Sequence, residues 1–145
     1  MFHMKLFVAT KGLVIREGKM LIMREASTYI DGTELGKWDV PGGRIAPEEP
    51  FLDGLIREIK EESGLGVHNP RIVSVQETFP VIHGEQCHIV RLYFVADGQE
   101  GEVVLSRDHD AYLWIDPQEH NAHHIMEDLH DVCETYLRQI THISS

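Results

Sequence analysis

At 145 residues, the chain is long enough for one globular domain and can bury roughly two-thirds of its unfolded surface. Its formal net charge of −11 at pH 7 opposes binding to nucleic acid polymers and to membrane surfaces, because an acidic protein repels their phosphates. A small phosphate ester would need a positive bridge to such a protein, and a divalent cation can supply it.

Targeting and redox signals are weak. No apolar run approaches the roughly 20 residues that span a bilayer, and the apolar stretch after Met1 is too short for a signal peptide. Cys87 and Cys133 fit no disulfide framework or zinc ribbon. We therefore expect a cytoplasmic protein with reduced thiols, folded as a single domain over residues 1–145.

The first part of the chain predicts strands that lead into a glycine-rich turn. Residues 5–15 are mostly apolar and predict a strand that is interrupted at residues 10–12, and residues 20–23 begin a second strand after a turn. Residues 26–36 form a polar loop that is longer than the usual connection of about 4–6 residues. A short strand at residues 38–40 ends in Pro41-Gly42-Gly43, which breaks regular structure.

Two helices and several strands follow. Pro50 suits the start of a helix that ends at Ser63, and Gly64 suits the left-handed residue after it. Strands are expected at residues 71–79, 88–96, 102–105 and 111–115, and an amphipathic helix from Asn121 to about Ile140. This order predicts an α/β fold with a mixed β-sheet between helices.

The helix at residues 50–63 breaks local rules of helix stability. Glu58, Glu61 and Glu62 share one face, and like charges at these spacings cost a few tenths of a kcal/mol per pair. Gly54 costs up to about 1 kcal/mol relative to Ala in mid-helix. A divalent metal with oxygen ligands would offset the repulsion, whereas a solvated acidic face is the simpler alternative. The apolar stripe expected to face the core is Leu52, Leu55, Ile56 and Ile59.

The sequence around these glutamates favours the metal site. Residues 43–65 read GRIAPEEPFLDGLIREIKEESGL, which resembles the Nudix box, G-x5-E-x7-R-E-U-x-E-E-x-G-U with U aliphatic, at every specified position. The preceding residues 38–43 look like the family's usual lead-in. The matching positions are Gly43, Glu49, Arg57, Glu58, Ile59, Glu61, Glu62, Gly64 and Leu65.

This resemblance to Nudix hydrolases, and to their MutT-like members, implies a Nudix fold (an α/β/α sandwich) and an enzyme that splits NDP-X into NMP and P-X. Glu58, Glu61 and Glu62 would hold magnesium or manganese, helped by the backbone carbonyl of Gly42. The ions would polarise the phosphoryl oxygens and activate a water molecule.

Catalytic roles are also implied for Glu49 and Arg57, which would pair and fix the loop before the helix, because a bidentate Arg–carboxylate contact sets geometry. The general base is left open between a box glutamate, Glu58 or Glu61, and an acidic residue elsewhere. The candidates elsewhere are Glu77, Glu85, Asp108 and Asp110.

Substrate contacts outside the box are less defined. Arg24 could meet a phosphate, and Tyr29 could stack on a base. Asn121 is either a helix N-cap or a base contact like that of MutT-like nucleotidases. We expect a nucleoside triphosphate or a nucleotide sugar such as ADP-ribose, bound by a monomer or homodimer.

Two alternatives accompany this interpretation. A Nudix-fold module could bind a nucleotide without turnover, but all of the box glutamates are present, which favours the hydrolase. His120, His123, His124 and His130 could hold zinc or nickel, but they spread around the helix among acidic residues, which favours a solvated face.

Overall fold

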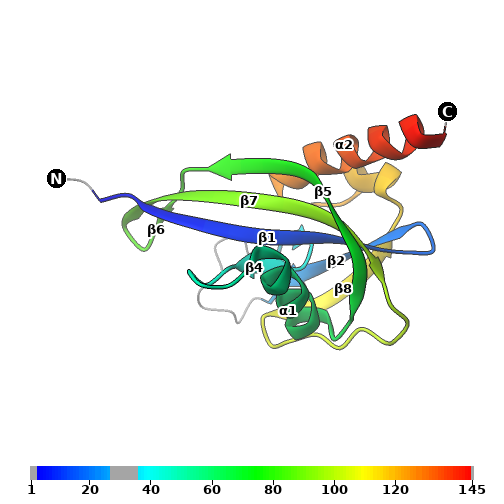
Figure 1. Ribbon diagram of the computed structural model, residues 1–145, viewed down its shortest axis with the longest axis horizontal. Coiled ribbons are helices and arrows are strands. Elements are labelled where there is room, and N and C mark those ends of the chain that lie inside the picture. The colour runs from blue at the N-terminus through cyan, green and yellow to red at the C-terminus, as the bar shows by residue number, and fades with distance from the viewer. Residues whose placement is uncertain (1–2, 27–35, 145) are drawn as a thin grey trace.

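The computed structural model describes residues 3–26 and 36–144, and it combines one large sheet with two helices (Figure 1). Tyr29 and most of the polar loop at residues 26–36 lie outside the described residues. The elements are β1 (Lys5–Arg16), β2 (Lys19–Glu25), β3 (Trp38–Asp39), β4 (Gly42–Arg44), α1 (Phe51–Ser63), β5 (Val67–Thr78), β6 (Val81–Ile82), β7 (Glu85–Gly98), β8 (His109–Ile115), the 3-10 helix η1 (Pro117–Ala122) and α2 (Glu127–Ser144).

The sheet is mixed, as predicted. Its order is β3-β2-β1-β7-β5, and β4, β6 and β8 pair with β1, β7 and β2, respectively. β1 and β7 run parallel, whereas the other pairs are antiparallel. The C-terminal end of β1 pairs with β2 next to their turn, and the middle of β1 pairs with β4. The divergence of β2 from β1 leaves room between them for the site described below.

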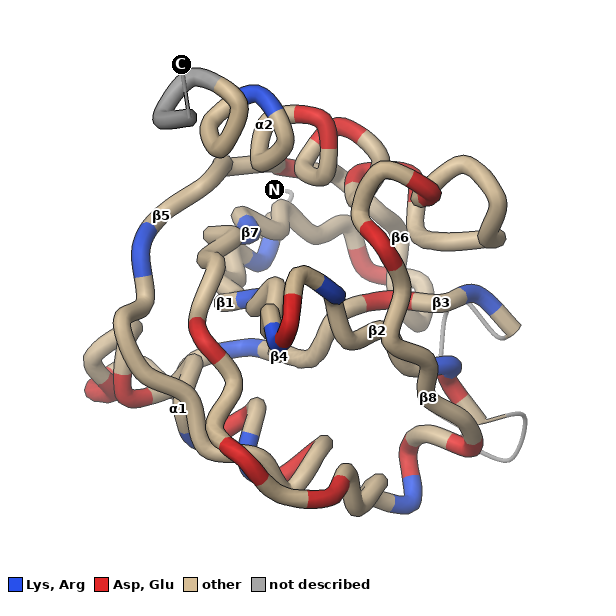
Figure 2. Tube along the Cα trace, turned by 90° about the vertical axis from the view of Figure 1, so that its right-hand side faces the viewer, with Lys and Arg blue, Asp and Glu red and all other residues tan. Residues whose placement is uncertain are grey.

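The two helices cover opposite faces of the sheet (Figure 2), so the expected α/β/α sandwich is confirmed. Leu55 and Ile59 of α1 pack with Phe94 on one face, and Leu129 and Val132 of α2 belong to the core on the other. Each fully buried side chain of this kind contributes roughly 1.5–3 kcal/mol. None of the described helices is both long and apolar enough to cross a membrane.

Helix α1 has the predicted ends but not the predicted buried face. Gly64 adopts a left-handed conformation (φ 77°), and its N–H donates to the carbonyl of Lys60. Leu52 and Ile56 are 36% and 41% exposed, so the expectation that they face the core is wrong. The buried stripe instead runs from Leu55 through Ile59 to Glu62, which turns the last carboxylate inward.

Two strand predictions were also wrong. β1 continues through residues 10–12 because these residues pair on one side with β4 and on the other with β7. Residues 102–105 form no strand, because this segment supplies backbone donors to the last carbonyls of α1. The N–H of Val104 donates to Ser63 O (2.8 Å), and the N–H of Ser106 donates to Glu62 O (3.3 Å).

The C-terminal helix starts six residues later than predicted, at Glu127, and Asn121 lies in η1 instead of capping it. The reason is a long-range pairing with β3. The N–H of Trp38 donates to His124 O (3.0 Å), and the N–H of Met126 donates to Trp38 O (2.9 Å). These hydrogen bonds hold the intervening segment extended, so the helical pattern of the sequence cannot continue through it.

Candidate active site

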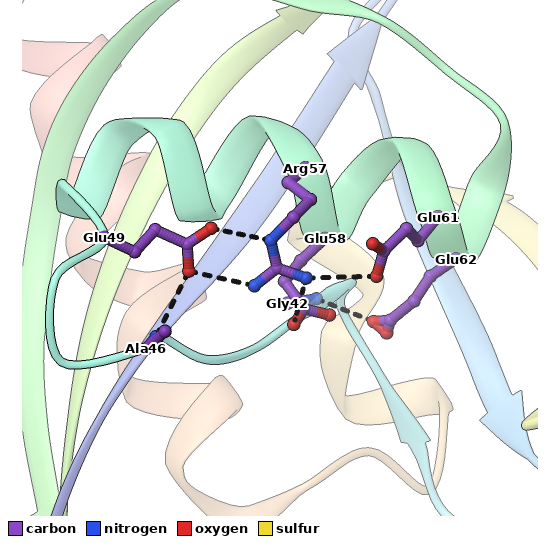
Figure 3. Close-up of polar contacts among 7 residues, drawn as sticks. All are labelled: Gly42, Ala46, Glu49, Arg57, Glu58, Glu61 and Glu62. Atoms are coloured by element: carbon purple, nitrogen blue, oxygen red, sulfur yellow. Dashed lines mark hydrogen bonds and ion pairs between the residues drawn. The ribbon is translucent and has the colours of Figure 1, made fainter.

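The loop before α1 is fixed by the predicted pair of Glu49 and Arg57 (Figure 3). Arg57 donates from Nε to Glu49 Oε2 (2.7 Å) and from a terminal nitrogen to Glu49 Oε1 (3.0 Å). The same carboxylate accepts the N–H of Ala46 at 3.2 Å. These bonds lower the pKa of Glu49, with Arg57 as the largest cause. This bidentate ion pair, called the Glu49–Arg57 fork below, therefore ties the loop to the helix that carries the acidic cluster.

Arg57 also contacts the acidic cluster itself. One terminal nitrogen lies 3.2 Å from Glu58 Oε1 and 3.1 Å from Glu61 Oε2 (Figure 3). Its charge offsets part of the repulsion between neighbouring carboxylates. The side chain of Glu61 is 58% exposed, whereas that of Glu58 is largely covered.

The glycines of β4 allow the glutamates to approach the sheet. A Cβ on Gly42 would lie 2.1 Å from the carbonyl oxygen of Thr10, and a Cβ on Gly43 would lie 2.9 Å from the carboxyl carbon of Glu58. The N–H of Gly42 donates to Glu62 Oε1 at 3.0 Å. A larger residue at Gly43 would push Glu58 away from the strand, whereas one at Gly42 would collide with the backbone of β1.

Burial disfavours the ionised form of two carboxylates of the cluster. Burial raises the pKa of Glu62 to about 7, because desolvation outweighs the attraction of Lys11 and the Gly42 N–H. Burial also raises the pKa of Glu58. A buried carboxylate with such a pKa gains most from a nearby cation, which favours its ionised form.

The donor set fits a hard divalent cation. Glu58, Glu61 and Glu62 offer the carboxylate oxygens that magnesium and manganese take as ligands. Within residues 3–26 and 36–144, no three acidic, His or Cys side chains converge closely enough to hold an ion. Arg57 lies between two of the carboxylates, so binding requires Glu61 to turn away from it.

A buried lysine beside the cluster was missed by sequence reasoning. Lys11 Nζ lies 2.8 Å from Asp39 Oδ2, and its side chain is 12% exposed. Burial disfavours the charged form of Lys11, but Asp39 and Glu62 outweigh it and raise its pKa. A lysine in the middle of the apolar strand was the available signal, because Lys is rarely buried unless it is paired.

A cavity of about 770 Å³ joins these groups. A second cavity of about 510 Å³ shares Lys37, Asp39, Ile82, Ile89, Arg91 and Met126 with the first. The polar groups that line the first cavity are Lys11, Glu25, Lys37, Asp39, Arg44, Glu58, Glu61, Glu62, His83, Arg91, Ser106, Asp108 and His109.

Of the four acidic base candidates outside the box, Asp108 lines the first cavity. Glu77 pairs with His88 (2.8 Å), and Glu85 forms an ion pair with Lys5. Asp110 pairs with Arg24 at 2.8 Å. Arg24 is therefore engaged in an ion pair. Neither Arg24 nor Asn121, two of the substrate contacts expected from the sequence, lines either cavity.

The histidine cluster differs from the expected solvated face in one respect. His120 is buried, and its Nδ1 lies 2.8 Å from Nδ1 of His130. These residues belong to no group that could hold a metal within the described part of the chain.

Burial raises the pKa of the Cys133 thiol to about 12, in keeping with an unreactive core residue.

Comparison with known proteins assigns the family. A family model described as NUDIX domain matches residues 6–133. The chain belongs to the NUDIX family. Human 8-oxo-dGDP phosphatase is 30% identical to this NUDIX protein over 105 residues, which are 72% of this chain and 29% of the human protein. CTP pyrophosphohydrolase of Escherichia coli is 24% identical over 119 residues, or 80% of either chain.

The fold comparison agrees with this assignment. The crystal structure of a MutT NUDIX hydrolase from Burkholderia pseudomallei superposes with a TM-score of 0.77 at 23% identity, covering 90% of this chain and 98% of that one. This likeness shows a shared fold. The present NUDIX chain spans less than a third of the human relative's length.

Proposed function

We propose that this NUDIX protein is a magnesium- or manganese-dependent enzyme that hydrolyses the pyrophosphate linkage of a nucleoside diphosphate derivative, NDP-X, to NMP and P-X. The observation that carries the proposal is that Glu58 and Glu62 lie beside the Gly42–Gly43 strand and, with Glu61, line a cavity that basic groups also line. The relatives named above, a nucleotide phosphatase and a nucleotide pyrophosphohydrolase, support the same class of substrate.

The residues of the chain have distinct roles in this proposal. Glu58, Glu61 and Glu62 hold the cation, and the Glu49–Arg57 fork positions the loop and the helix that present them. When bound, the metal polarises the phosphoryl oxygens and lowers the pKa of a nearby water. Two of these carboxylates are already desolvated, so their attraction for a cation is weakly screened.

Basic groups farther along the cavity suit the phosphate chain. Lys11 and Arg91 line the first cavity, and Arg91 also lines the second. Arg91 is oriented by a hydrogen bond of 2.7 Å to Thr78 and an ion pair of 3.7 Å with Asp128. In this arrangement the two basic side chains would hold the anionic phosphate chain and offset its repulsion by the negatively charged protein.

The second cavity suits the nucleoside. Its lining mixes apolar and polar side chains, and Phe79, 61% exposed, stacks on His88 with ring centroids 4.3 Å apart. Asp128 adds an acceptor at the same cavity, and burial raises its pKa. An aromatic face together with a few polar groups is typical of sites that bind a planar base.

The test is a substrate panel resolved by product. Nucleoside triphosphates, deoxynucleoside triphosphates, nucleoside diphosphates and nucleotide sugars such as ADP-ribose are incubated with magnesium, with manganese and with a chelator. We expect NMP and P-X from at least one substrate when a divalent ion is present. Tight nucleotide binding without any product would instead support a non-catalytic module.

A further inference from the structure

The start of β8 contains a β-bulge beside the active-site cavity. Arg24 pairs with Ala111, but the next pair joins Glu25 to His109, so Asp110 is the extra residue. β-Bulges are frequent next to active sites because they redirect a side chain. Without the extra residue, Asp110 would lie opposite Glu25 and His109 would leave this position.

The bulge places His109 on the face of the sheet that carries α1. Paired residues of antiparallel strands share a face, and Met23 shares that face with Glu25 because side chains alternate. Met23 packs in the same core as Leu55 and Ile59 of α1. The imidazole of His109 accordingly lines the cavity that also contains the box glutamates.

The backbone beside His109 is anchored, but one nitrogen of its imidazole lacks a hydrogen-bond partner. Within the described part of the chain, His109 Nδ1 is buried without a hydrogen-bond partner, and so is the hydroxyl of Ser106. The same segment is anchored to α1, because the N–H of Ser106 donates to the carbonyl of Glu62. A buried polar atom without a partner costs roughly 1–3 kcal/mol, which a ligand or a water molecule in the cavity can recover.

The charges around His109 favour its neutral form. Burial is the largest effect, and Lys11 of β1 acts in the same direction, so that together they lower the pKa of His109. Asp39 of β3 and the adjacent Asp108 and Asp110 oppose this effect without reversing it. At pH 7 the ring therefore keeps a lone pair that can accept a proton, and a base whose pKa lies near the working pH is the most effective.

We propose that His109 is a catalytic residue of this NUDIX protein and accepts the proton of the attacking water. The inference rests on the proposed hydrolase function. In the step, the water oxygen forms a bond to phosphorus and its proton passes to the imidazole. The bridging P–O bond breaks, and its electron pair leaves with the departing phosphate, which later receives a proton from the imidazolium or from solvent.

The other candidates have competing roles. Glu77, Glu85 and Asp110 are engaged in the ion pairs described above. In the proposed function the box glutamates bind the cation, and their protonation would displace it. Asp108 lines the same cavity, so it provides the sharpest comparison with its neighbour His109.

The experiment measures kcat and KM from pH 5 to pH 9 at saturating magnesium for the wild type, His109→Gln and Asp108→Asn. His68→Gln is the matched control, because His68 lies on β5 with a side chain that is 61% exposed. For His109→Gln we expect a loss of kcat of about 10²–10⁴-fold with little change in KM. The fall in rate below the pKa of His109 should disappear in this variant and persist in Asp108→Asn and His68→Gln.

A second measurement keeps the assignment testable if the variant does not fold. The pKa of the His109 ring in the wild-type protein is measured by NMR and compared with the acidic limb of kcat/KM, which reports the free enzyme. Agreement supports the proposal, whereas a mismatch overturns it. An active wild type with an unimpaired His109→Gln variant overturns this inference alone. A wild type that is inactive on every nucleotide overturns the proposed function as well.

Discussion

Replacement of Glu62 by Gln should stabilise the metal-free protein at neutral and alkaline pH. Glu62 is 9% exposed, and burial raises its pKa from 4.5 to about 7. At 1.36 kcal/mol per pKa unit, this rise corresponds to roughly 3 kcal/mol of unfavourable free energy when the folded protein carries the ionised carboxylate. Gln retains the side-chain oxygen that accepts the Gly42 N–H and has nearly the same volume.

The sign of the pH dependence follows from the direction of the pKa change. Between pH 4.5 and about pH 7, the folded protein binds more protons at Glu62 than the unfolded chain does, so stability falls as the pH rises. Below pH 4.5 both states are protonated, and above about pH 7 the full cost is present. Glu58, whose pKa burial also raises, adds a contribution of the same sign.

The assay is urea unfolding of the wild type and the Glu62→Gln variant at several pH values from 4.5 to 8, in the presence of a chelator. The variant should lose less stability over this range, by up to about 3 kcal/mol. Glu61→Gln is the control, because the side chain of Glu61 is mostly exposed and its replacement should change the pH profile far less. Parallel profiles for wild type and Glu62→Gln would refute the argument that this carboxylate is strained by burial.

Two further outcomes follow from the site. Arg57→Ala should lower the melting temperature and reduce turnover on the order of 10²-fold, since it releases Glu49 and shifts the acidic helix. Calorimetry and steady-state kinetics check these effects. Values that match the wild type would mean that the Glu49–Arg57 ion pair is not needed for stability or turnover. Magnesium at 100 times its Kd should stabilise the protein by about 2.7 kcal/mol, because it binds the folded state. Thermal melts that do not move with millimolar magnesium would argue against a cation site at the acidic end of α1.

Local signals in the sequence were sufficient for the ends of α1, whereas the contact between Glu49 and Arg57 was implied by the resemblance to the Nudix box. Pro50 and Gly64 impose backbone preferences that act within one helical turn. The mixed sheet with a helix on each face follows from the order of strands and helices. The box spacing also identified the carboxylates that lie beside β4, although the angle of α1 on the sheet decided that Glu62 turns inward and Ile56 outward.

Features that depend on pairing between distant segments could not be predicted. The start of α2 is set by hydrogen bonds between Trp38 and the chain near His124, which overrule a continuous helical pattern. Lys11 meets Asp39 because β4 begins three residues after Asp39 and pairs Gly42 with Lys11 of β1. The position of His109 depends on one extra residue in the pairing of β2 and β8, and no local pattern reveals such a shift of register.

The central claim is that the acidic end of α1 binds a divalent cation for pyrophosphate hydrolysis, and Glu61→Gln tests it most directly. The side chain of Glu61 is largely exposed, so the variant should keep the melting temperature of the wild type in metal-free buffer. With magnesium and the best substrate of the panel, we expect turnover to fall by about 10²-fold or more, because metal stabilisation of the transition state is worth several kcal/mol. Wild-type turnover by this variant, or equal wild-type rates with and without a chelator, would contradict the account.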